Sequence, residues 1–218
     1  MHMHLTSARN PLAGMAAACL LSAFASAGEM THTVEHMARD TAPARAIAGT
    51  QATLRTDANG ALMRMETAEL APGHVTTAWW VIMTNPAACS ATPCPPDDVI
   101  GRAEEVGTQI VYADGAVNTD EGHAAFSAYL PAGKVDGGWY ERSFPEPEAA
   151  EIHLVLNDHG PLIPDLAASM LTSYRGGCST ESLPPPFPDT AKADGQPGPN
   201  QCRLIQDAIF IQPTSPSN

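Results

Sequence analysis

Basic side chains and aromatic rings are scarce in this sequence. The 218 residues include 11 lysines and arginines against 24 aspartates and glutamates, for a formal net charge of -13, and aromatic residues make up only 6%. A phosphate backbone or an anionic membrane surface is bound through a concentrated positive field, which this acidic composition lacks. We therefore exclude nucleic acid as a partner and expect an unknown protein or a small-molecule ligand.

Catalytic signatures are missing as well. The sequence contains no G-x-S-x-G, S-x-x-K, G-x-x-x-x-G-K-[ST] or G-x-G-x-x-G motif, and these are the patterns that mark several classes of hydrolase and nucleotide-binding enzyme. Carboxylates are plentiful, but their number carries no information on spacing. The sequence thus favours a protein that is not an enzyme and leaves its catalytic residues unknown.

Long hydrophobic runs are absent after the first 27 residues. Arg9 precedes an apolar run, 11–24, that ends in the small residues Ala25, Ser26 and Ala27, which is the form of a secretory signal peptide. An N-terminal membrane anchor is the alternative, but the run is too short to cross about 30 Å of hydrocarbon. We predict cleavage after Ala27, a periplasmic or extracellular location, and no transmembrane segment in the mature chain.

The four cysteines beyond the leader predict two disulfide bonds, because an even number of cysteines in an exported chain is typical of oxidised pairs. Three connectivities are possible. We favour Cys89 with Cys94 and Cys178 with Cys202, since each pair brackets a proline-rich loop and closes locally. A zinc site would require closer pairs and reduced thiols.

Alternation of apolar and polar residues predicts an all-β protein. Short runs of this kind, separated by Pro, Gly, Asp and Asn, are 52–56, 61–68, 76–83, 109–113, 123–130, 151–156 and 204–211. Their spacing is typical of an antiparallel sandwich or barrel. The run 76–83 is apolar on both faces and is expected to be a central strand. One short helix is predicted at 166–173, with Asp165 as its N-cap.

The turn between the first two runs allows a prediction of register. A two-residue loop at Asn59 and Gly60 would set Arg55 against Arg64, which is an unfavourable like-charge pair. A four-residue loop instead sets Leu54 opposite Met63, and this is the pairing that we expect. The organisation predicted for the mature chain is an edge strand or linker at 28–50, one β domain at 51–212 with long proline-rich loops, and a flexible tail at 213–218.

Histidines offer the clearest candidates for a metal site. In an extended strand His153 and His159 share a face, but they stand about 20 Å apart unless the chain turns near Asn157, and turn residues do follow at 158–161. His123 opens another predicted strand on its polar face. The three histidines suit copper or zinc; the alternative is that they are structural histidines joined by hydrogen bonds.

Three further groups of residues have weaker patterns. None of them leads us to predict a resident cofactor. One group of histidines and methionines would suit copper, and one group of acidic residues with an asparagine would suit calcium. Two tryptophans form the third group, which suits either a ligand site or the core. The groups are Met30, His32, His36 and Met37 for copper, Asp114, Asn118, Asp120 and Glu121 for calcium, and Trp79 with Trp80.

Three stretches, 70–89, 122–130 and 150–161, resemble a group of secreted bacterial β-proteins of unknown activity. A fainter resemblance is to the chordin-type (CHRD) β-domain, whose His-Ile-His-Gly-Pro stretch is similar to 151–153 together with 159–161. Glu151 replaces the first histidine of that stretch, and extra residues precede Gly160. Both resemblances imply an exported β fold and neither implies an activity.

Two hypotheses follow for function. The first is an exported, disulfide-stabilised β-sandwich that binds a partner or belongs to the envelope or matrix and is not an enzyme. The second is a copper or zinc protein, or a metal-dependent hydrolase, that uses His153 and His159 with His123 or His74.

Overall fold

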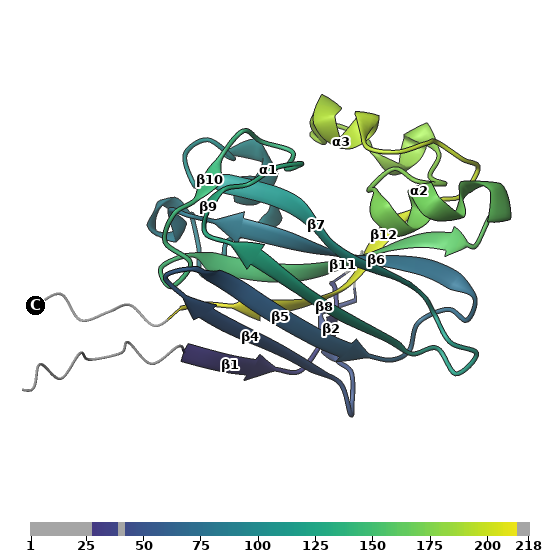
Figure 1. Cartoon of the computed structure of the whole chain (residues 1–218), viewed down its shortest axis with the longest axis horizontal. Coiled ribbons are helices and arrows are strands. Elements are labelled where there is room, and N and C mark those ends of the chain that lie inside the picture. Colours follow the sequence, from purple (N-terminus) through teal and green to yellow (C-terminus); the bar gives the residue numbers. More distant parts are fainter. Residues whose placement is uncertain (1–27, 39–41, 213–218) are drawn as a thin grey trace, which may run out of the picture.

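The computed structural model describes residues 28–38 and 42–212. The predicted leader with its cleavage site at Ala27, and the predicted tail at 213–218, lie outside the described residues. Two antiparallel sheets form the body of the protein (Figure 1). This confirms the predicted all-β class and the antiparallel sandwich.

The first sheet has four strands in the order β1-β4-β5-β8, and the second has six in the order β3-β2-β12-β11-β6-β7. A separate two-stranded ribbon, β9 with β10, lies in the loop after β8. The strands of the first sheet are Gly28–His32 (β1), Gln51–Asp57 (β4), Gly60–Thr67 (β5) and Ala124–Pro131 (β8). Those of the second are Glu35–His36 (β2), Arg45–Ala46 (β3), His74–Met83 (β6), Thr108–Val117 (β7), Glu151–Pro161 (β11) and Arg203–Phe210 (β12), and the ribbon is Gly133–Lys134 (β9) and Ser143–Phe144 (β10).

Strand β6 is central, as its two apolar faces predict. It pairs with β11 on one side and with β7 on the other. Trp80 and Ile82 point toward the four-stranded sheet and are buried with Leu54, Met63 and other apolar side chains in the core between the sheets. The opposite face of β6, with Trp79 and Val81, belongs to a second apolar cluster, so the six-stranded sheet is covered on both sides.

A layer of loops and short helices covers that second face (Figure 1). The α-helices are Pro96–Gly101 (α1), Ala167–Thr172 (α2) and Asp189–Ala193 (α3), and the 3-10 turns are Pro86–Ala88, Pro164–Leu166 and Thr180–Ser182. Helix α2 is the predicted one, whereas α1 and α3 lie in proline-rich loops where no helical pattern was visible. Both predicted disulfides are confirmed, and both lie in this layer.

The predicted N-cap at Asp165 is wrong. Pro164 starts a 3-10 turn that includes Asp165, and the residue that precedes α2 is Leu166, with no side-chain capping bond. Proline suits the first turn of a helix because its backbone angle is already fixed and it has no N–H that would need a partner there. Pro164 therefore starts a 3-10 turn, and the N-cap position of α2 falls at Leu166 instead of Asp165.

The register of the first hairpin is confirmed, since Leu54 lies opposite Met63. The pairing continues one step further, to Asp57 opposite Gly60, so the loop consists of Ala58 and Asn59 alone and the predicted four-residue loop is wrong. The carboxylate of Asp57 accepts the N–H of Asn59 at 2.7 Å, which supports the tight turn.

Strand β11 does not turn after Asn157, although its sequence predicts a turn at 158–161. It continues to Pro161 through irregularities in its pairing with both neighbours. Gly160 has a φ of 78°, and its N–H donates to the carboxylate of Asp158 at 2.8 Å. These turn-forming residues therefore build a bulge within the strand instead of ending it.

The segment at 28–50 supplies edge strands to both sheets. Strand β1 pairs with β4 in the four-stranded sheet, and β2 and β3 form the outer edge of the six-stranded sheet beside β12. Across 28–38 and 42–212, no helix has the length and apolar character needed to cross a bilayer.

Candidate ligand groove

A groove lies on the loop-covered face of the six-stranded sheet. Its volume is about 340 Å³, which is within the range of small-molecule sites. Side chains of β6, β7 and β11 form its floor, and proline-rich loops and α1 form its sides. Its apolar lining includes Trp79, Val81, Ile110, Val155, Pro93, Pro95, Val99 and Ile100, together with Trp139, Tyr174 and Phe187.

Four aromatic rings pack against one another at this groove. The ring centroids of Trp139 and Tyr174 are 4.5 Å apart, those of Trp79 and Tyr174 are 5.0 Å apart, and both pairs meet edge to face. Phe187 lies 5.9 Å from Trp139. Such contacts are favourable beyond their buried area, so the aromatic wall is preformed.

Backbone hydrogen bonds hold the loop that carries Trp139 against β7. The N–H of Trp139 donates to the carbonyl of Ile110 at 2.8 Å, and the Thr190 hydroxyl donates to the Trp139 carbonyl at 2.8 Å. The buried side-chain amide of Gln109 accepts the N–H of Tyr140 with its oxygen and donates to the carbonyl of Tyr140 with its nitrogen. Trp139 itself is 5% exposed, and its Nε1 has no hydrogen-bond partner among the residues described.

Tyr174 is the one ring of this four-ring aromatic wall that carries a titratable group. It is 5% exposed, and burial raises the pKa of its hydroxyl far above its ordinary value. Its backbone N–H donates to the carboxylate of Asp194 at 3.0 Å, which anchors the start of the disulfide loop to α3. The phenol therefore stays neutral and serves as part of the apolar wall.

One end of the groove is acidic. Glu35 on β2 lies directly opposite Asp207 on β12, and both carboxylates line the groove with His153. Burial raises the pKa of Asp207 to about 6; His153 opposes this rise and Glu35 adds to it. The lining residues that are described include no lysine or arginine.

His153 is fixed by a hydrogen bond to its own strand. Its Nε2 donates to the carboxylate of Glu151 at 2.7 Å, since a carboxylate only accepts, and the same oxygen accepts the N–H of Cys94 at 2.6 Å. This pair links β11 to the Cys89–Cys94 loop. The other ring nitrogen of His153, Nδ1, makes no hydrogen bond with a described residue.

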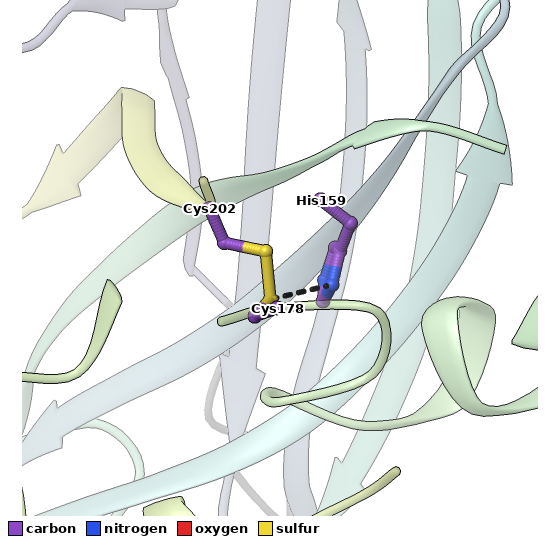
Figure 2. Close-up of side chains that lie close together, drawn as sticks. All are labelled: His159, Cys178 and Cys202. Carbon is purple, nitrogen blue, oxygen red and sulfur yellow. Dashed lines mark hydrogen bonds between the residues drawn. A yellow bond between two sulfur atoms is a disulfide. The ribbon is translucent and has the colours of Figure 1, made fainter. Parts of the chain in front are cut away.

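His159 lies against the second disulfide (Figure 2). Its Nδ1 donates to the carbonyl of Gly176 at 2.8 Å and lies 3.4 Å from the sulfur of Cys178. Its Nε2 accepts from the hydroxyl of Thr77 at 2.8 Å, and that oxygen accepts from Nε1 of Trp79 at 2.8 Å. Burial lowers the pKa of His159, so the imidazole is neutral. A chain of hydrogen bonds thus joins the groove to the disulfide loop.

A metal ion would need ligand atoms that this cluster already uses. Across 28–38 and 42–212, the one group of His, Cys or acidic residues with metal-ligand spacing is His159, Cys178 and Cys202. The two sulfurs are bonded to each other, and both nitrogens of His159 have protein partners. In the oxidised protein the arrangement therefore acts as a structural cluster.

The predicted metal histidines are not brought together. His153 and His159 share one face of β11 as expected, but the strand continues through Asn157, which keeps them about 20 Å apart. His123 is exposed beside β8, in the other sheet. Each of the two buried histidines has its own hydrogen-bond partners, as the structural alternative describes.

The weaker candidates are also spread over the fold. His32 on β1 packs edge to face on Phe210, while His36 on β2 bonds to Glu69 at 3.0 Å. The carboxylate of Asp114 accepts two backbone N–H groups, including that of Ser127 at 2.9 Å. These histidines and this aspartate have structural partners in place.

Sequence reasoning recognised part of the groove and missed its aromatic wall. Alternation on β6 separates Trp80, which is in the core, from Trp79, which lines the groove. Trp139, Tyr174 and Phe187 come from irregular segments that carry no periodic signal. Comparisons with protein-family models, with curated proteins and with solved structures gave no match.

Proposed function

We propose that this protein is exported and binds a small apolar molecule in the groove, without acting as an enzyme. The observation that carries this proposal is the preformed aromatic wall of a groove of about 340 Å³. Rings that already pack on one another lose little freedom when a ligand arrives, and this favours binding.

The chemistry of the lining supports a binding role. The described residues at the groove include no serine, threonine or lysine, and the sulfur of Cys94 is in a disulfide. His153 has one nitrogen committed to Glu151. The groove therefore offers contact area and a few polar anchors in place of an activated nucleophile.

Two disulfides support an oxidising compartment, either the periplasm or the medium. Both staple the loop layer that forms the groove, and not the core between the sheets. We infer that the bonds stabilise the ligand site in a place where the chain meets no reducing system. A role in the envelope or matrix is compatible with this account.

Isothermal titration calorimetry with phenylbutanol tests the proposal, because this neutral molecule has an aromatic ring and fits the groove volume. We expect measurable binding to the folded protein. Ile100→Trp, which adds a ring to the groove lining, should weaken binding by at least about tenfold, or about 1.4 kcal/mol. Ile211→Trp is the matched control, since Ile211 is 45% exposed and does not line the groove.

Phe187→Ala is a second variant that removes part of the wall without filling the space, and it should also weaken binding. Equal affinity of the parent, Ile100→Trp and Phe187→Ala for phenylbutanol would show that binding occurs elsewhere. Absence of binding by the parent protein would reject the proposed apolar site.

A further inference from the structure

The acidic and aromatic parts of the groove are aligned across the sheet. Glu35, Asp207, Val155 and Trp79 are successive cross-strand partners on β2, β12, β11 and β6. Adjacent strands are about 4.8 Å apart, so Asp207 and Trp79 are separated by about 10 Å. The row therefore runs from two carboxylates at one end to the buried ring of Trp79, which backs the groove, at the other.

The two carboxylates in this row have no hydrogen-bonded or ion-paired partner among the described residues, although His153 acts on Asp207 through space. Within the described chain, neither Glu35 nor Asp207 accepts a side-chain hydrogen bond or forms an ion pair. Three other acidic side chains are buried in the described chain, and each is paired with a basic side chain: Asp98 with Arg102, Glu151 with His153, and Asp158 with His74. Partly buried charges are costly without a counter-charge, so this pair leaves a place for a positive group.

His153 completes the acidic end. The hydrogen bond from its Nε2 to Glu151 fixes the ring, and in the neutral form its free Nδ1 is an acceptor. An ammonium group has several N–H donors and could bond to this nitrogen and to a carboxylate at once. Charge-assisted hydrogen bonds of this kind are the stronger ones.

We propose that the groove binds an organic cation, an ammonium group carried on an apolar or aromatic body. The ammonium lies between Glu35, Asp207 and His153, and the apolar body lies against the partly exposed lining residues Ile100 and Phe187. This inference rests on the proposed function, because it assigns the charge and the orientation of the ligand in the same groove.

A matched series of probes tests the inference by calorimetry at neutral pH. Phenylbutylamine is cationic, phenylbutanol is neutral and phenylbutyrate is anionic, while their apolar bodies are alike. We expect the amine to bind about tenfold more tightly than the alcohol, and the carboxylate to bind most weakly. Added salt should weaken the amine more than the alcohol.

Variants of the acids locate the ammonium. Glu35→Gln and Asp207→Asn keep the side-chain shape and should each reduce the affinity for phenylbutylamine by about tenfold, with little change for phenylbutanol. Glu121→Gln is the control, because Glu121 is exposed in the loop between β7 and β8. Thermal denaturation of each variant confirms that it is folded.

The outcomes separate the two proposals. If the alcohol binds as tightly as the amine, the cation inference is overturned and the apolar groove stands. If none of the three probes binds, both proposals fail. Tight binding of calcium or zinc alone, lost in Glu35→Gln, would assign the acidic end to a metal ion and overturn the organic cation.

Discussion

Glu35 and Asp207 face each other directly across two antiparallel strands, although both carry carboxylates. Like charges in this position oppose folding, and no lysine or arginine among the described lining residues offsets them. The pair therefore lowers the stability of the free protein. We expect the same arrangement to be favourable once a cation occupies the groove.

Asp207→Asn should stabilise the free protein at neutral pH. The carboxyl has a pKa of about 6 in the folded protein against an ordinary value of 3.8, so between these values the folded state binds more protons than the unfolded state. The free energy of unfolding therefore falls as the pH rises through this window, and the loss persists above it. With a discount for partial solvent access, we expect a gain of about 1 to 2 kcal/mol.

Urea denaturation at several pH values measures this effect. The gain should shrink as the pH falls from about 6 toward about 4 and vanish below that, where Asp207 is protonated in both states. Asp158→Asn is the matched control and should destabilise, because Asp158 pairs with His74 at 2.9 Å and accepts the N–H of Gly160. A loss of stability in Asp207→Asn at neutral pH would contradict the prediction.

Binding of phenylbutylamine should weaken as the pH falls through about 6, since Asp207 then takes up a proton and loses its charge. The other titratable groups that face Asp207 are Glu35 and His153. Phenylbutanol should show a much flatter profile over the same range. A calorimetric series at fixed ionic strength compares the two probes, and parallel profiles would argue against an electrostatic contact.

The two disulfides should contribute unequally to stability. Chain-entropy arguments give about 3.5 kcal/mol for Cys178–Cys202, which closes a separation of 24 residues, and about 2 kcal/mol for Cys89–Cys94, which closes 5. Denaturation of the two double Cys→Ala variants tests this order. Mass spectrometry after alkylation without reductant should find none of these four thiols free, and labelled cysteines would refute the pairing.

His159→Leu should destabilise the protein by about 2 to 4 kcal/mol, because it leaves the Thr77 hydroxyl and the Gly176 carbonyl without the imidazole. His123→Leu is the control at an exposed position and should change stability by less than about 0.5 kcal/mol. Zinc added to the oxidised parent should leave its melting temperature unchanged. A zinc-dependent rise that His159→Leu removes would revive the metal site.

Local alternation was enough to predict an antiparallel sandwich or barrel, because the order of apolar and polar residues in a strand indicates which of its faces is buried. Trp79 and Trp80 illustrate this: neighbours in sequence, they belong to different apolar clusters. The hairpin register at Leu54 and the disulfide pairs followed from equally local arguments. Each of these features depends on residues close together in the chain.

The groove depends on distant residues. Glu35 and Asp207 are separated by most of the chain and meet only because β2 pairs with β12. Trp139 and Tyr174 come from two different loops. The residues after Asn157 have the composition of a turn, but pairing with β6 on one side and β12 on the other keeps β11 extended, so tertiary context overrides the local preference.

The loop layer rests on a sandwich whose own core lies on the opposite side of the six-stranded sheet. Substitutions at Phe187, Ile100 and neighbouring positions can therefore alter the groove while the packing between the two sheets stays intact. The residues that line the groove can thus vary between related sequences while the sandwich beneath them stays the same. This separation also makes this layer the natural place to build libraries of binders with new chemical preferences.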